Sequence, residues 1–121
     1  MPRPDPFSPH ERTELVAALQ ALMGTQGDEY VAIADSERTV GTFQVAQIDD
    51  DYSVYVEWSD AGRLQDVGLD LPGGSVVEDE RDGSATITLP GLDAAATSDV
   101  LAHWARSLIG DHPLIWETTA Q

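Results

Sequence analysis

Hydrophobic residues near the start of the chain recur every three or four positions, which is the spacing of an amphipathic helix. This pattern predicts a helix over residues 9–23. Ser8 is a suitable N-cap, Pro9 takes the first helical position, and Glu11 stands where a capping box requires it. Gly24 is a typical helix end.

A second helical pattern lies near the other end of the chain. It begins near Asp93 or Ser98 and runs to about Ile109, where Gly110 ends it. The apolar tail at residues 114–116 follows. This tail either packs against the core or adds an edge strand.

Between the two helices the hydrophobic period changes to two, which is typical of strands with one buried face. Turns that contain Gly, Pro or Asp separate the strands, and Asp82-Gly83 favours a tight hairpin. The expected strands are 29–34, 42–48, 52–59, 64–71, 75–80 and 84–89.

Strands that follow one another through short turns pair antiparallel, and two amphipathic helices can cover one sheet face. The expected fold is therefore a two-layer α+β domain. It has an antiparallel sheet of about five to six strands, an N-terminal helix and a C-terminal helix. Proline alternates with polar residues at the start, so residues 1–8 are expected to form a flexible arm and residues 9–121 a single domain.

Composition narrows the function. Six Arg, no Lys and 22 acidic residues give the 121-residue chain a net charge of −16. A Schiff base, a Walker lysine, a thiol catalyst and a disulfide all need residues that are missing here. Nucleic acids and anionic membranes should repel the chain, whereas basic partners should be attracted. The alternative is that the charge only keeps the protein soluble.

The chain shows no apolar segment of the ~18 residues that span a membrane, and its start lacks the apolar region of a signal peptide. We therefore expect a cytoplasmic protein.

The histidines give little support for catalysis. His10 and Glu14 could share a metal ion, but two ligands do not make a site. His103 borders the apolar stripe of the second helix, and His112 lies in a loop. We expect no enzyme activity, no catalytic residue, no metal and no cofactor. Two alternatives stay open: a small-ligand or metal-binding domain, and a small hydrolase that uses His103 or His112.

The candidate partner-binding residues are an exposed aromatic residue and the acidic clusters. Tyr55 has the opposite phase to Trp58, so it could lie on an open sheet face beside Phe43 or Gln44. The acidic clusters lack the spacing of an EF-hand loop and could instead receive a basic partner. Solvated turns and a charged sheet edge are the simpler alternatives. The candidates are Phe43, Tyr55, Glu57, Asp49, Asp50, Asp51, Glu78, Asp79 and Glu80.

Most of the chain resembles the type III secretion chaperone-like group, in particular its YbjN-like or TY-Chap branch. The resemblance rests on the helix at Ser8–Met23, the strand at Tyr52–Trp58 and the helix at Thr97–Ile109. It implies a non-enzymatic protein that binds another polypeptide, often as a homodimer. It also implies a helix after the third strand, whereas residues 60–74 alternate like a strand. We expect a chaperone-like, adaptor or immunity protein that captures a basic polypeptide.

Overall fold

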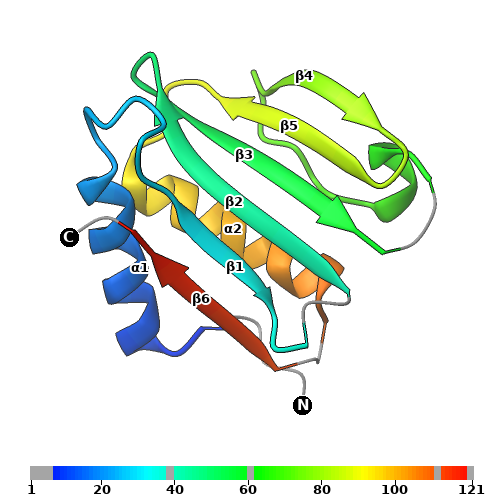
Figure 1. Ribbon diagram of the computed structural model, residues 1–121, viewed down its shortest axis with the longest axis horizontal. Coiled ribbons are helices and arrows are strands. Elements are labelled where there is room, and N and C mark those ends of the chain that lie inside the picture. The colour runs from blue at the N-terminus through cyan, green and yellow to red at the C-terminus, as the bar shows by residue number, and fades with distance from the viewer. Residues whose placement is uncertain (1–6, 38–39, 60–61, 111–112, 120–121) are drawn as a thin grey trace.

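The computed structural model describes residues 7–37, 40–59, 62–110 and 113–119. Within these ranges the chain forms an antiparallel sheet and two α-helices, which confirms the α+β class (Figure 1). The elements are α1 (Pro9–Ala21), β1 (Val31–Asp35), β2 (Gly41–Ile48), β3 (Asp51–Trp58), the 3₁₀-helix η1 (Leu64–Val67), β4 (Val76–Arg81), β5 (Ser84–Leu89), α2 (Ala94–Leu108) and β6 (Leu114–Thr118).

Helix α1 begins as its sequence predicts. The Ser8 hydroxyl accepts from the Glu11 amide at 3.1 Å, and the Glu11 carboxylate accepts from the Ser8 amide at 3.0 Å. Phe7, which we had placed in the arm, is only 2% exposed and belongs to the hydrophobic core. The folded domain therefore begins before the N-cap, because burying an aromatic ring stabilises this end of the helix.

The strands are arranged in the order β4-β5-β3-β2-β1-β6, with every neighbouring pair antiparallel. The tail after α2 returns as the edge strand β6 beside β1, and its Leu114 and Trp116 also pack against the core, so both alternatives are confirmed. β4 and β5 form the predicted hairpin, in which Gly83 takes a left-handed φ of 88°. Both edges of the sheet, β4 and β6, come from segments far apart in the sequence.

The predicted strand over residues 64–71 is wrong. Residues Leu64–Val67 form η1, and the amide of its N-cap residue, Arg63, donates to the Asp66 carboxylate at 2.9 Å. Gly68 follows with a left-handed φ of 72°. β5 already occupies the edge of β3 that this segment would need. The backbone amides at the start of this segment bond to side chains instead, such as the Leu64 amide to the Glu80 carboxylate.

The segment after η1 is held against α2. The indole Nε1 of Trp104 donates to the Asp70 carbonyl at 2.7 Å, and His103 Nε2 lies 3.2 Å from the Asp70 carboxylate. The alternating hydrophobic residues of this segment suggested a strand. In the structure, Val67 and Leu69 are partly buried and pack against the core without strand pairing.

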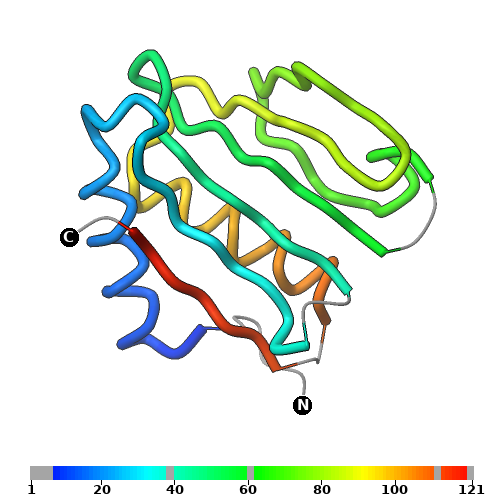
Figure 2. Tube along the Cα trace, viewed as in Figure 1, coloured from blue at the N-terminus to red at the C-terminus, as the bar shows by residue number. Residues whose placement is uncertain are grey.

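Alternate residues of the central strands share one core with both helices. Phe43 of β2 stacks on Trp104 of α2, with ring centroids 6.3 Å apart. Gly41 brings α2 especially close, because a Cβ at this position would lie 2.5 Å from Leu108 Cδ2. The tube in Figure 2 shows α2 running behind β2, with its turns visible between β1 and β2. Within the described residues, no helix is long and apolar enough to cross a membrane.

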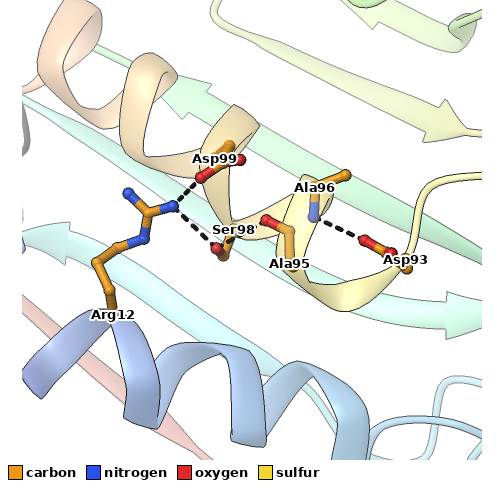
Figure 3. A network of polar contacts seen from close by, with 6 residues as sticks. All are labelled: Arg12, Asp93, Ala95, Ala96, Ser98 and Asp99. Carbon is orange, nitrogen blue, oxygen red and sulfur yellow. Dashed lines mark hydrogen bonds and ion pairs between the residues drawn. The ribbon is translucent and has the colours of Figure 1, made fainter. Parts of the chain in front are cut away.

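A polar contact joins the two helices (Figure 3). The Arg12 guanidinium of α1 donates to the Ser98 hydroxyl at 3.1 Å and forms an ion pair with Asp99 of α2. The Arg12 side chain is 22% exposed, so the pair is shielded from solvent on the α1 side. Asp93 caps the N-terminus of α2 by accepting from the Ala96 amide at 2.8 Å.

Candidate protein-binding surface

One face of the sheet carries residues that alternate with the core residues. Strand register brings them into two rows that cross five strands. Half of the side chains are Ala, Ser or Thr, and the two residues from β1 are both alanine, so the face is low over β1. The first row is Glu117, Ala32, Gln44, Tyr55 and Thr86; the second is Ile115, Ala34, Thr42, Glu57 and Ser84.

A hollow of about 90 Å³ lies on this face over β1. We call it the β1 hollow; it is lined by Ala32, Ala34, Thr42, Ile115, Trp116 and Glu117. Ala34 is only 5% exposed although it lies opposite the core side, because Ile115 and Thr42 flank it in the register. Short alanine side chains between longer neighbours therefore produce a concave, largely apolar site.

Tyr55 and Glu57 lie where the sequence places them. Tyr55 is 38% exposed on the open face and pairs with Gln44, and Glu57 is exposed one row away. Together they form a ridge on β3, two strands from the β1 hollow.

Phe43 is not part of this surface, contrary to our expectation. Its side chain is fully buried, since its register partners Ile33 and Val56 are core residues of the neighbouring strands. The phase of β2 therefore points Phe43 toward Trp104 of α2, and Gln44 is the β2 residue beside Tyr55.

The acidic turn at Asp49 and Asp50 lies at one end of the β2–β3 hairpin. Both residues have left-handed φ values of 51° and 68°, and the Asp49 amide donates to the Gln26 side chain at 3.1 Å. Asp51 begins β3, and its carboxylate accepts from the Gly91 amide at 3.3 Å. The turn therefore combines local structural contacts with exposed negative charge.

The second acidic cluster lies on β4, at the opposite edge from β6. The register shifts at Glu78, and Asp79 pairs with Arg81 at 3.6 Å. The Glu80 carboxylate accepts from the Leu64 amide at 2.9 Å, which fixes the start of η1. A bulge and charged side chains are typical protection for a sheet edge, so β4 is poorly suited to pairing with another strand.

The histidines do not converge on the acidic groups of this face. His10 Nε2 lies 2.7 Å from the Glu14 carboxylate on the solvent-exposed side of α1, and His103 contacts Asp70. His112 lies outside the described residues. Across the described ranges, no three His, Asp or Glu side chains are close enough to hold a metal ion.

A buried phenol has a structural role. The Tyr52 hydroxyl donates to the Leu19 carbonyl at 2.7 Å, which joins β3 to α1. Burial raises the pKa of the Tyr52 phenol, and the nearby negative charge of Asp93 adds to the shift.

The residues that line the β1 hollow could not be identified from the sequence pattern. Ala32 and Ala34 alternate with buried Val31 and Ile33, a pattern that identifies a second face but not its neighbours. Ile115 and Glu117 complete the lining of the hollow because β6 pairs with β1, and the sequence pattern does not show this pairing.

Comparisons of this chain with protein-family models, with curated proteins and with solved structures found no match.

Proposed function

We propose that the chain is a non-enzymatic, acidic protein-binding module that captures a basic polypeptide on the open face of its sheet. Chaperone-like, adaptor and immunity roles all fit this activity. The observation that carries the proposal is a concave apolar hollow beside exposed carboxylates on a chain of net charge −16.

The proposed surface follows from a two-layer arrangement. In Figure 1, α2 lies behind the strands and α1 lies at the side of β1 and β6, and the buried residues of both helices belong to the hydrophobic core. The other face of the sheet then has no cover among the described residues, which leaves Tyr55 and the β1 hollow accessible. Exposed aromatic and apolar side chains next to polar ones are typical of protein-binding sites.

Charge supports the choice of a basic partner. Glu117 lines the β1 hollow, Glu57 lies two strands away on β3, and the acidic turn immediately precedes β3. A strongly negative chain accelerates the encounter with a positive partner and disfavours negative ones. The resemblance to chaperone-like proteins supports the same proposal, since that group binds polypeptides without catalysis.

The test begins with a partner captured from the organism that encodes the chain and then purified. Its affinity is measured by calorimetry for the wild-type protein, for Tyr55→Ala, and for the matched control Met23→Ala. Met23 is an exposed hydrophobic residue just after α1, 64% exposed. We expect Tyr55→Ala to weaken binding about 10-fold and Met23→Ala to leave it unchanged.

Salt dependence provides the second measurement. Association of a basic partner should slow markedly between ~0.05 M and ~0.5 M salt, because the added ions screen the attraction. Binding that Tyr55→Ala leaves intact, or association that salt does not affect, would contradict the proposed surface.

A further inference from the structure

We infer that the occupant of the open face is a cationic amphipathic α-helix that lies over the β1 hollow. This inference rests on the proposed function and specifies the structure of the bound segment. It combines the spacing of the strands, the hydrogen bonding of the sheet and the charge of the surrounding residues.

Hydrogen bonding distinguishes a helix from an extended segment here. β1, β2 and β3 lie inside the sheet, and each is paired on both sides. Their backbone groups are therefore unavailable to an extended peptide placed on the face. Such a peptide would lose water from its own N–H and C=O groups without replacing it, at a cost of about 1–3 kcal/mol for each buried group. A helix satisfies these groups internally.

The dimensions fit a helix. The β6 side of the hollow and the Tyr55–Glu57 ridge are three strand spacings apart, which is about 14 Å. An α-helix with its side chains is about 10–12 Å wide. Between these borders, Ala32, Ala34 and Thr42 form a low floor that allows the backbone of a helix to approach closely. The longer side chain of Gln44 lies next to Tyr55, at the β3 side of this floor.

The chemistry selects a cationic helix. Apolar side chains of the partner would pack on Ala32, Ala34 and Ile115, which line the hollow. Lys or Arg side chains on the flanks of the partner helix could extend toward Glu57 and Glu117. Long cationic side chains can cover apolar surface with their stems while their charged ends stay in water.

The experiment uses two synthetic peptides of the same composition, Leu, Ala and Lys, each of roughly 14 residues, which is about four helical turns. In one, Leu recurs at helical spacing on one face; in the other, the order is scrambled. Binding to the full chain is measured by fluorescence anisotropy at ~50 mM salt. We expect the amphipathic peptide to bind about 10-fold tighter and to gain helical circular dichroism when bound.

Four variants locate the site. Ala32→Leu fills the hollow and should remove the preference for the amphipathic peptide, whereas Ala17→Leu adds the same side chain on exposed α1 and should not. Glu57→Gln should weaken binding about 2- to 5-fold. Glu78→Gln makes the same charge change on the exposed β4 edge and should have a smaller effect. Thermal unfolding of each variant verifies that it folds.

Several results would overturn the inference. Equal affinity for the two peptides would mean that charge alone attracts them, and no binding would mean that the hollow does not receive a helix. Neither result affects the capture of a partner through Tyr55, which is tested separately. Binding that Ala32→Leu leaves unchanged would also place the helix elsewhere.

Amide chemical shifts distinguish the remaining occupants. The Thr119 amide donates to the Tyr30 carbonyl, and the Ser36 amide donates to the Pro113 carbonyl. The backbone N–H and C=O groups of the odd-numbered β6 residues therefore point toward β1. The backbone groups of Leu114 and Trp116 therefore point away from the sheet. Peptide-induced changes confined to these two amides would indicate strand addition at β6. Changes that depend on protein concentration without peptide would indicate a second copy of the chain. Either result would refute the helix.

Discussion

Replacing Gly41 by Ala tests how closely α2 lies against the sheet. The new methyl group would lie 2.5 Å from Leu108 Cδ2 and 2.7 Å from Leu108 Cγ, so either the leucine or the helix must move. Overpacking of this kind typically costs about 1–3 kcal/mol. Gly41 has no left-handed φ, so the backbone itself accepts alanine. We therefore expect Gly41→Ala to lower the free energy of unfolding by about 1–3 kcal/mol.

The same reasoning predicts a rescue. Leu108→Ala is destabilising by itself, but it removes both leucine atoms that the new methyl group would meet. In that background Gly41→Ala should be neutral or stabilising by up to about 1 kcal/mol, because alanine restricts the unfolded chain more than glycine does. The coupling energy between the two positions should thus be about 1–3 kcal/mol, a value typical of residues in contact.

Urea denaturation followed by tryptophan fluorescence measures all four members of this cycle. Gly73→Ala is the matched control, since nothing lies within 4 Å of a Cβ at this position and its φ is not left-handed. It should be neutral or slightly stabilising. An equal cost of Gly41→Ala with and without Leu108 would refute the close contact between β2 and α2.

Three further predictions concern charge and burial. Arg12→Met should destabilise the protein by about 1 kcal/mol through loss of its contacts with Ser98 and Asp99, and the cost measured by urea denaturation should shrink in 1 M salt. The melting temperature of the wild-type protein should rise between ~10 mM and 1 M salt, because screening of the −16 charge shortens the Debye length from about 30 to about 3 Å. The raised pKa of Tyr52 means that the unfolded phenol releases its proton first as the pH rises, so stability should fall above about pH 10. Tyr52→Phe should reduce that fall and cost about 1–2 kcal/mol at pH 7, since the Leu19 carbonyl loses its donor.

Local signals in the sequence predicted the two helices and most strands. Ser8 and Glu11 form a capping box that depends only on residues three positions apart, and Asp82-Gly83 forms a turn that depends on two residues. Such features need no knowledge of distant partners. The helix ends agree with the predicted ones within about two residues.

The errors share a cause in contacts between distant segments. Residues 64–71 alternate like a strand, but β5 takes the available edge of β3. Phe43 was expected on the surface, although the sequence correctly placed it on the same face of its strand as Val45. The pattern of β2 alone does not show which of its two faces α2 covers. The β1 hollow likewise requires β6, which is separated from β1 by most of the chain.

The two edges of the sheet suggest how the chain could bind a partner without binding itself. β4 presents charged residues from Glu78 to Arg81 and a register shift, whereas the only charged residue of β6 is Glu117. An edge strand with a single charged residue, next to an apolar hollow, would ordinarily favour self-association. Two copies of this chain, however, each carry a net charge of −16, so they repel one another in low salt. A cationic helix meets attraction instead, and its own backbone is already satisfied. If the proposed function holds, the excess charge would discriminate between partners, and raising the salt concentration should weaken binding of the cationic helix while it permits contact between copies.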